Sequence, residues 1–157
     1  MTDFSVGDLM KKLNAKFRVK QEVELPPVLC ADDDASICRL VTMMLERNGF
    51  RVEVVHNGRE ALDRIEKNEY AAILLDLQIP YVHGATVLAL LRQRKPEVLR
   101  KVIVMSALND AALADVYGVA SAVIRKPILD DTLVRNVHAI VGTPTEEVGE
   151  LSATAHL

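Results

Sequence analysis

Four short apolar runs, each followed within two residues by a polar or charged side chain, constrain the fold of this chain more than any other feature. Runs that are apolar throughout are typical of strands buried on both faces of a parallel sheet. In such a sheet the residues after the strands gather at one edge, where open α/β folds build their sites. The runs are 28–31, 72–75, 102–105 and 122–124, and the side chains that follow them are Asp32 to Asp34, Asp76, Ser106 and Lys126.

A fifth strand and several helices fit between these runs. Residues 51–56 alternate between polar and apolar side chains, which is typical of a strand with one buried face. Alternation of strands with helices predicts an α/β fold, in which a doubly wound, five-stranded parallel sheet has helices on both faces. We expect the helices around the apolar stripes 37–45, 61–65, 87–91 and 133–141 and over 109–117, with Asp130 or Asp131 capping the last of them.

Charge balance and apolar content limit the classes of partner. The 157 residues carry a net charge of −3, from 19 basic and 22 acidic side chains, whereas nucleic-acid-binding domains usually carry a basic excess. No run reaches the ~18 apolar residues of a membrane span, and the first residues lack the apolar stretch of a signal peptide. We therefore expect a cytoplasmic protein with no nucleic-acid partner and no membrane insertion.

Neither the cysteines nor the histidines show the spacing of a metal site. The two cysteines, Cys30 and Cys38, fit no zinc or redox motif, so they are predicted to be buried or spare thiols. The four histidines are predicted to be surface or partly buried residues.

The first 25 residues are predicted to form an amphipathic extension outside the α/β domain. Ser5 is placed to cap a helix with Asp8 in its first turn, and basic residues occupy the faces away from an apolar stripe. A short isolated helix is only marginally stable in water, so this stripe needs a cover. The cover is the rest of the chain, a second copy in a homodimer, a target protein or a membrane surface. The stripe consists of Val6, Leu9, Met10, Leu13 and Phe17.

The predicted sheet edge gathers side chains that suit phosphoryl chemistry. Carboxylates from three aspartates would meet the hydroxyl of Ser106 and the ammonium of Lys126 in one small cleft. Clustered acids repel one another, and a divalent metal ion relieves that repulsion. A carboxylate nucleophile beside a metal, flanked by a hydroxyl and a lysine, suits the acceptance of a phosphoryl group. The three aspartates are Asp32, Asp33 and Asp76.

Four motifs, in their order along the chain, resemble the receiver domain of two-component response regulators. The resemblance covers about residues 26–142, which we take as a receiver domain between the N-terminal extension (1–25) and a flexible acidic tail (143–157). It implies a flavodoxin-like sheet with strand order 2-1-3-4-5. The motifs are VLCADDD at 28–34, LLDLQIP at 74–80 with a loop that ends at Gly84, VMSA at 104–107 and RKP at 125–127.

The resemblance implies an acceptor residue and a Mg²⁺ site. Asp76 would be the phosphoacceptor, because a carboxylate at a strand end can attack a phosphohistidine and become an aspartyl phosphate. Asp33 would bind Mg²⁺ directly, and Asp32 directly or through water. Asp76 and the backbone carbonyl of Gln78 would supply further oxygen ligands, which Mg²⁺ prefers. Helix capping is the simpler interpretation of the acidic run, and we expect it for Asp34.

Two further residues would contact the phosphoryl group, and a third departs from the family pattern. Ser106 takes the family's Ser/Thr position, whose hydroxyl moves toward the phosphate as the first step of the switch. Lys126, which precedes Pro127 in a pair where a cis peptide is expected, would pair with Asp76 and then with phosphoryl oxygens. Receivers commonly carry a Tyr or Phe switch residue at the position of Val123. Valine has no ring to swing inward, so we expect the signal to leave through the loop after Ser106 and the following helix.

The resemblance therefore predicts a stand-alone receiver that takes a phosphoryl group from a histidine kinase or phosphotransfer protein and contacts a downstream target protein. It is expected to have no enzymatic activity beyond its own phosphorylation and dephosphorylation. The alternative is a phosphorylation-independent pseudo-receiver that acts as an interaction scaffold, which Val123 favours and the intact acids oppose. A phosphatase of the haloacid-dehalogenase type would place a second aspartate at Gln78. A flavodoxin-type flavin binder would carry a Ser/Thr-rich loop where this chain has acids.

Overall fold

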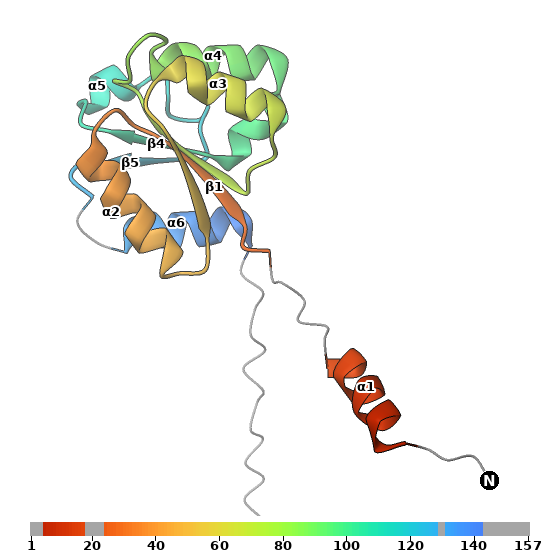
Figure 1. Ribbon diagram of the computed structural model, residues 1–157. Coiled ribbons are helices and arrows are strands. Elements are labelled where there is room, and N and C mark those ends of the chain that lie inside the picture. Colours follow the sequence, from red (N-terminus) through yellow and green to blue (C-terminus); the bar gives the residue numbers. More distant parts are fainter. Residues whose placement is uncertain (1–4, 18–23, 129–130, 143–157) are drawn as a thin grey trace, which may run out of the picture.

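The central element is a parallel sheet with the strand order β2-β1-β3-β4-β5, as the sequence predicted (Figure 1). The computed structural model describes residues 5–17, 24–128 and 131–142. Each strand begins and ends within one residue of the bounds that the sequence predicted. The strands are β1 (Pro27–Ala31), β2 (Arg51–Val55), β3 (Ala72–Asp76), β4 (Val102–Ser106) and β5 (Ala122–Arg125).

Helices cover both faces of this sheet and enclose two hydrophobic clusters. Apolar side chains of α2 and α6 pack on one face, and those of α3, α4 and α5 pack on the other (Figure 1). Successive residues of each strand point to opposite faces, so Leu29 joins one cluster and Cys30 the other. The helices are α1 (Val6–Phe17), α2 (Ala35–Glu46), α3 (Gly58–Lys67), α4 (Gly84–Arg94), α5 (Asp110–Leu113) and α6 (Thr132–Val141), with a 3₁₀-helix η1 (Pro96–Lys101).

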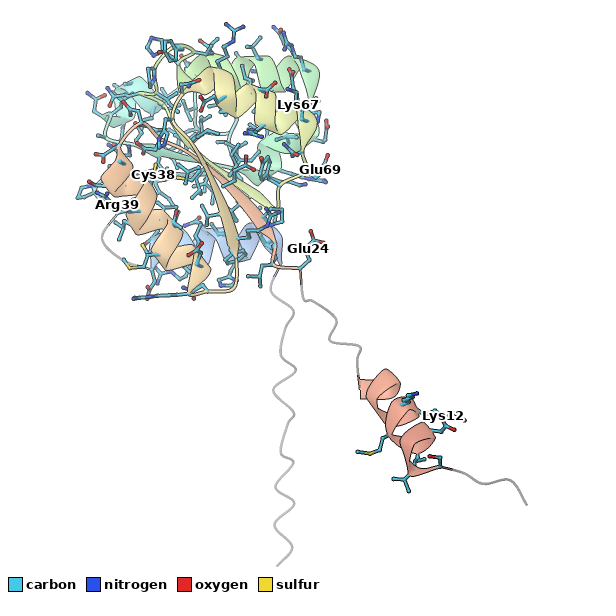
Figure 2. All side chains as sticks on the ribbon, viewed as in Figure 1. Lys12, Glu24, Cys38, Arg39, Lys67 and Glu69 are labelled. Atoms are coloured by element: carbon cyan, nitrogen blue, oxygen red, sulfur yellow. The ribbon has the colours of Figure 1, made fainter. Side chains whose placement is uncertain are left out.

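Both cysteines are buried and free, as predicted. Cys30 lies in β1, between β2 and β3 in the sheet. Cys38 points from α2 toward the sheet, whereas its neighbour Arg39 faces outward (Figure 2).

The helices that follow β1 and β2 begin at side-chain caps. The Asp34 carboxylate accepts hydrogen bonds from the backbone N–H groups of Ser36 and Ile37, which confirms its predicted capping role. Asn57 caps α3 in the same way by accepting from the N–H of Glu60. These caps fix where the chain turns from the sheet edge into each helix.

Two glycines hold the loop after β3 against the starts of α3 and α4. A Cβ atom at Gly58 would lie 1.8 Å from the carbonyl oxygen of Val82, and one at Gly84 would lie 2.4 Å from that of Asp76. The Gly58 N–H donates to Pro80 O at 3.2 Å, and the Gly84 N–H donates to Leu77 O at 3.1 Å. Because these contacts are to backbone, a side chain at either glycine would displace the loop that follows Asp76.

Two helix predictions were partly wrong. The helix expected over 109–117 ends at Leu113, because Val116 N–H bonds the Leu113 carbonyl in a tighter turn and Gly118 has φ +84°. Asp131 precedes α6, but its side chain makes no capping hydrogen bond, and Asp130 lies outside the described residues. The 3₁₀-helix η1 follows α4 directly and was not among the elements that the sequence predicted.

The N-terminal stripe forms a helix, α1, as its spacing predicted. The side chains of Val6, Leu9 and Met10 on this helix are exposed. The predicted tail at 143–157 lies outside the described residues. Among the described residues, no helix combines the length and the apolar character needed to cross a membrane.

Candidate functional site

Three carboxylates meet where β1 and β3 end. One carboxylate oxygen from each of Asp32, Asp33 and Asp76 lies within 4.8 Å of the other two. Asp32 and Asp76 are buried, and Asp33 is exposed at the rim. Neighbouring carboxylate oxygens with one exposed side are a donor set that fits Mg²⁺, which keeps several waters when a protein binds it. The structure therefore brings together the three aspartates that the sequence singled out.

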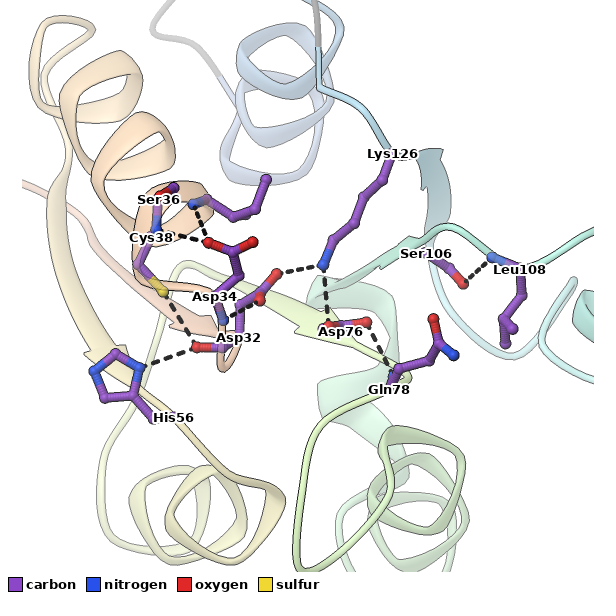
Figure 3. Close-up of polar contacts among 11 residues, drawn as sticks. Asp32, Asp34, Ser36, Cys38, His56, Asp76, Gln78, Ser106, Leu108 and Lys126 are labelled. Atoms are coloured by element: carbon purple, nitrogen blue, oxygen red, sulfur yellow. Dashed lines mark hydrogen bonds and ion pairs between the residues drawn. The ribbon is translucent and has the colours of Figure 1, made fainter.

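The ammonium of Lys126 lies between the two buried acids. Its Nζ donates to Asp32 Oδ2 at 2.6 Å and to Asp76 Oδ2 at 3.0 Å (Figure 3). Lys126 follows β5 and reaches across β4, and its peptide bond to Pro127 is cis, as expected. Only 16% of its side-chain surface is exposed. One cation thus serves two carboxylates, and the cluster keeps a net negative charge.

Burial and ion pairing have opposite effects on the pKa values of Asp32 and Lys126. Burial raises the pKa of the Asp32 carboxyl, although hydrogen bonds from Lys126 and the Asp34 N–H work in the opposite direction. Burial alone would lower the pKa of the Lys126 ammonium, but its bonds to Asp32 and Asp76 outweigh burial and raise the pKa. The lysine is therefore held in its charged form, and its charge offsets part of the effect of burial on the pKa of Asp32.

Both oxygens of Asp76 have a fixed partner. Its Oδ1 accepts from the backbone N–H of Gln78 at 3.0 Å, and its Oδ2 accepts from Lys126. Gln78 thus reaches the site through its N–H, and the metal-ligand role of its carbonyl stays a prediction. The contact of Gly84 with the Asp76 backbone fixes the same turn. The Asp76 carboxylate is therefore held in one orientation by contacts within the protein.

Ser106 is buried at the end of β4 with its hydroxyl turned away from Asp76 (Figure 3). Its Oγ accepts from the backbone N–H of Leu108 at 3.0 Å. In the sheet, Met105 pairs with Asp76, and Ser106 pairs with Arg125. Ser106 therefore lies on the strand next to Asp76, but its hydroxyl contacts the loop that follows β4.

Val123 lies on β5, away from the acid cluster. It is half-buried, pairs with Val104 and packs on the face that α3, α4 and α5 cover. Its role as a switch position stays a prediction.

Cys38 and His56 contact the site, although the sequence did not point to them. Cys38 Sγ donates to the backbone carbonyl of Asp32 at 3.2 Å, and His56 Nδ1 lies 3.1 Å from the same oxygen (Figure 3). His56 follows β2, so the rule that gathers residues at strand ends would have found it. Cys38 carried no such signal, because its contact depends on how α2 packs on the sheet.

A family model described as the response regulator receiver domain matches residues 28–138. This chain is a receiver domain. The match extends over the whole sheet and includes the acid cluster, Ser106 and Lys126. The strand order agrees with this family, whose members are phosphoacceptors in two-component systems.

The relatives and solved structures that match include other two-component proteins. The uncharacterized transcriptional regulatory protein YkoG of Bacillus subtilis is 32% identical over 78% of this chain and 55% of its own length. A receiver domain of the Francisella response regulator 1452 is 31% identical, with a TM-score of 0.67 over 74% of this chain and 96% of that one. TrrA of Thermotoga maritima, solved in complex with Mg²⁺–BeF, is 25% identical with a TM-score of 0.66 over 74% of this chain and 99% of that one. The chain spans about half the length of YkoG.

Proposed function

We propose that this receiver accepts a phosphoryl group on Asp76 from a phosphohistidine of a histidine kinase or phosphotransfer protein, with Mg²⁺ at the acid cluster. The observation that carries this proposal is the convergence of three carboxylates and one ammonium at a single edge of the sheet. A structural salt bridge needs one acid for one base. The third carboxylate, from exposed Asp33, adds negative charge that a bound cation would offset.

The chemistry of the transfer follows from the contacts of Asp76. One of its carboxylate oxygens attacks phosphorus, the bond from phosphorus to the donor imidazole nitrogen breaks, and the electron pair stays on that nitrogen. Lys126, already within 3.0 Å of Asp76 Oδ2, is placed to neutralise charge on the incoming phosphoryl oxygens. Asp32, Asp33, Asp76 and the carbonyl of Gln78 would hold Mg²⁺, which supplies further positive charge to those oxygens when bound.

The phosphorylated form would act through contact with a downstream protein. Receivers change the shape of a surface rather than carry out chemistry on a target, so a protein that binds the altered surface is the expected partner. The prediction that nucleic acid is not a partner rests on the net charge of −3 alone. YkoG and SrrA of Staphylococcus aureus are named as transcriptional regulators, which gives that prediction no support.

A phosphorylation-independent scaffold is the second candidate, and Val123 is the residue that favours it. The scaffold would need no metal site and no ammonium at the acceptor. The structure places Lys126 between both buried acids, and these contacts favour the phosphoacceptor.

Incubation with acetyl phosphate and Mg²⁺, followed by intact mass spectrometry, tests the proposal. We expect one added phosphoryl group that hydroxylamine removes, because acyl phosphates are cleaved by this nucleophile. Asp76→Asn should gain none. Asp115→Asn, a change at an exposed aspartate outside the cluster, is the matched control and should react like the unchanged protein. Phosphorylation of the Asp76→Asn protein would refute the assignment, and failure of the unchanged protein to react would favour the scaffold.

A further inference from the structure

A chain of hydrogen bonds leads from the buried hydroxyl of Ser106 to the protein surface. Ser106 Oγ accepts from the N–H of Leu108 at 3.0 Å, and the carbonyl of Leu108 accepts from Arg125 Nη1. Arg125 Nη2 donates to Asp110 Oδ1, which also accepts from Tyr117 Oη at 3.0 Å. We call these five residues the polar latch: Ser106, Leu108, Asp110, Tyr117 and Arg125.

Leu108 is the centre of the latch because both of its backbone polar groups are engaged. Its N–H holds the serine hydroxyl, and its carbonyl is held by the guanidinium of Arg125. Arg125 is also the residue that pairs with Ser106 in the sheet. Arg125 is therefore linked to Ser106 in two ways. The two residues pair in the sheet, and the Arg125 side chain contacts the carbonyl of Leu108, whose N–H donates to Ser106. A shift of the Leu108 peptide changes the contacts of both side chains.

The outer end of the latch lies on the surface. The side chains of Arg125 and Asp110 are 45% and 80% exposed, and Tyr117 is 49% exposed. A hydrogen bond from Tyr117, followed by those from Arg125, lowers the pKa of the Asp110 carboxyl, so this acid stays charged at neutral pH. The latch thus ties a buried residue beside the acceptor to an ion pair that solvent and partners reach.

A path from Ser106 to the surface through the latch is needed because Val123 has no aromatic ring to transmit the signal. Its β-branched side chain has few rotamers, and it packs into the core on the same face of the sheet as Leu108 and as Leu113 of α5. In the resting structure the Ser106 hydroxyl faces Leu108 rather than Asp76 (Figure 3). Turning Oγ toward a phosphoryl group on Asp76 would leave the Leu108 N–H without its partner, and a shift of Leu108 to find a new one would break the contact of its carbonyl with Arg125.

We propose that Arg125 is a positioning residue that holds Ser106 in its resting orientation through Leu108, and that loss of this hold opens the Asp110–Tyr117 surface when Asp76 is phosphorylated. This inference rests on the proposed function. A ligand that prefers the turned serine binds only after the latch contacts break, so the free energy needed to break them lowers its apparent affinity. Removing the Arg125 contacts removes the cost and raises the affinity.

Beryllofluoride with Mg²⁺, which mimics the acyl phosphate, provides the measurement. Titration of the full chain, followed by calorimetry or backbone amide shifts, should show Arg125→Met binding about fivefold more tightly than the unchanged protein, at the lower end of allosteric coupling energies. Arg94→Met is the matched control. It breaks an ion pair with Glu66 of similar exposure on another surface, at 2.8 Å, and should leave the affinity unchanged.

A double variant separates positioning from a general structural effect. In a Ser106→Ala background there is no hydroxyl to hold, so Arg125→Met should no longer change beryllofluoride affinity. Asp110→Asn weakens the hold on Arg125 without removing the guanidinium, and it should raise the affinity by a smaller factor. This milder variant also answers the question if Arg125→Met fails to fold.

Four results would overturn the inference. They are an unchanged or weaker affinity in both Arg125→Met and Asp110→Asn, an Arg125 effect that persists without the serine hydroxyl, an equal gain in Arg94→Met, and absence of binding by the unchanged protein. The last of these also refutes the proposed function, whereas the first three leave it standing.

Discussion

Replacing Lys126 by methionine tests whether the buried acids depend on its charge. The ammonium lies 2.6 Å from Asp32, which is fully buried, and 3.0 Å from Asp76. Removing one partner of a buried ion pair costs about 3–5 kcal/mol. Each acid keeps one backbone N–H donor, from Asp34 or Gln78, so we expect a loss at the lower end of this range, about 3–4 kcal/mol at neutral pH.

The chain contains a matched control for burial. Lys67 and Asp63 also form an ion pair at 2.6 Å, but their side chains are 68% and 51% exposed (Figure 2). An exposed pair contributes about 0–1 kcal/mol, so Lys67→Met should cost at most that. Urea unfolding of both variants in buffer with EDTA gives the comparison, because a bound cation would otherwise replace the missing charge.

The pH dependence of the loss has a definite sign. Burial already raises the pKa of Asp32, and loss of Lys126 raises it further. A carboxyl with a raised folded-state pKa contributes stability that is fully present below its unfolded pKa and is lost as pH rises. The deficit of Lys126→Met should therefore shrink as pH falls from neutral toward the ordinary Asp pKa of about 4, as the carboxyl takes up a proton. Equal losses in Lys126→Met and Lys67→Met, or a deficit that does not change with pH, would refute this reasoning.

Three further predictions concern other parts of the molecule. Asp33→Ala should weaken Mg²⁺ binding at least tenfold, measured by calorimetry, with unchanged urea unfolding in EDTA; an unchanged affinity would remove Asp33 from the metal site. Gly58→Ala should lower the free energy of unfolding by about 1–3 kcal/mol, because its Cβ would meet the Val82 carbonyl. Gly7→Ala on exposed α1 should cost no stability, and equal effects of the two changes would contradict the tight packing of Gly58 against Val82. Burial, followed by contact with Glu53, raises the pKa of Tyr70 to about 12, so its stabilising contribution is fully present below about pH 10 and is lost as pH rises through 12. Tyr70→Phe should lose this component of the pH dependence, and identical stability curves for the two proteins would contradict it.

The sequence predicted the sheet and most of the site because strands buried on both faces carry a strong local signal. The runs before Asp32, Asp76 and Ser106 are apolar throughout, and parallel topology then brings their ends together. Lys126 was found by the same rule, two residues after the run at 122–124. These predictions needed no knowledge of how the helices pack.

The parts that were missed depend on tertiary contacts or on side-chain orientation. Cys38 reaches the Asp32 carbonyl only because α2 packs in one particular way on the sheet. The direction of the Ser106 hydroxyl follows from the loop at Leu108, and the ion pair of Arg125 with Asp110 joins residues that no periodicity connects. The early end of α5 reflects a tight turn and Gly118, whose positive φ the helical pattern did not reveal.

The register between β1 and β3 sets the distance between the two buried acids of the site. Ala31 pairs with Leu75, so Asp32 and Asp76 are the next residues on adjacent strands, set one strand spacing apart, about 4.8 Å. Backbone hydrogen bonds rather than loop conformation thus fix the gap between these two acids. Lys126 comes from two strands beyond β3 and must bridge about twice that spacing, which the four methylenes of lysine allow. A slip of β3 by one residue would turn Leu75 toward Lys126 and remove the acceptor, so the site can exist only in the register that also buries the core.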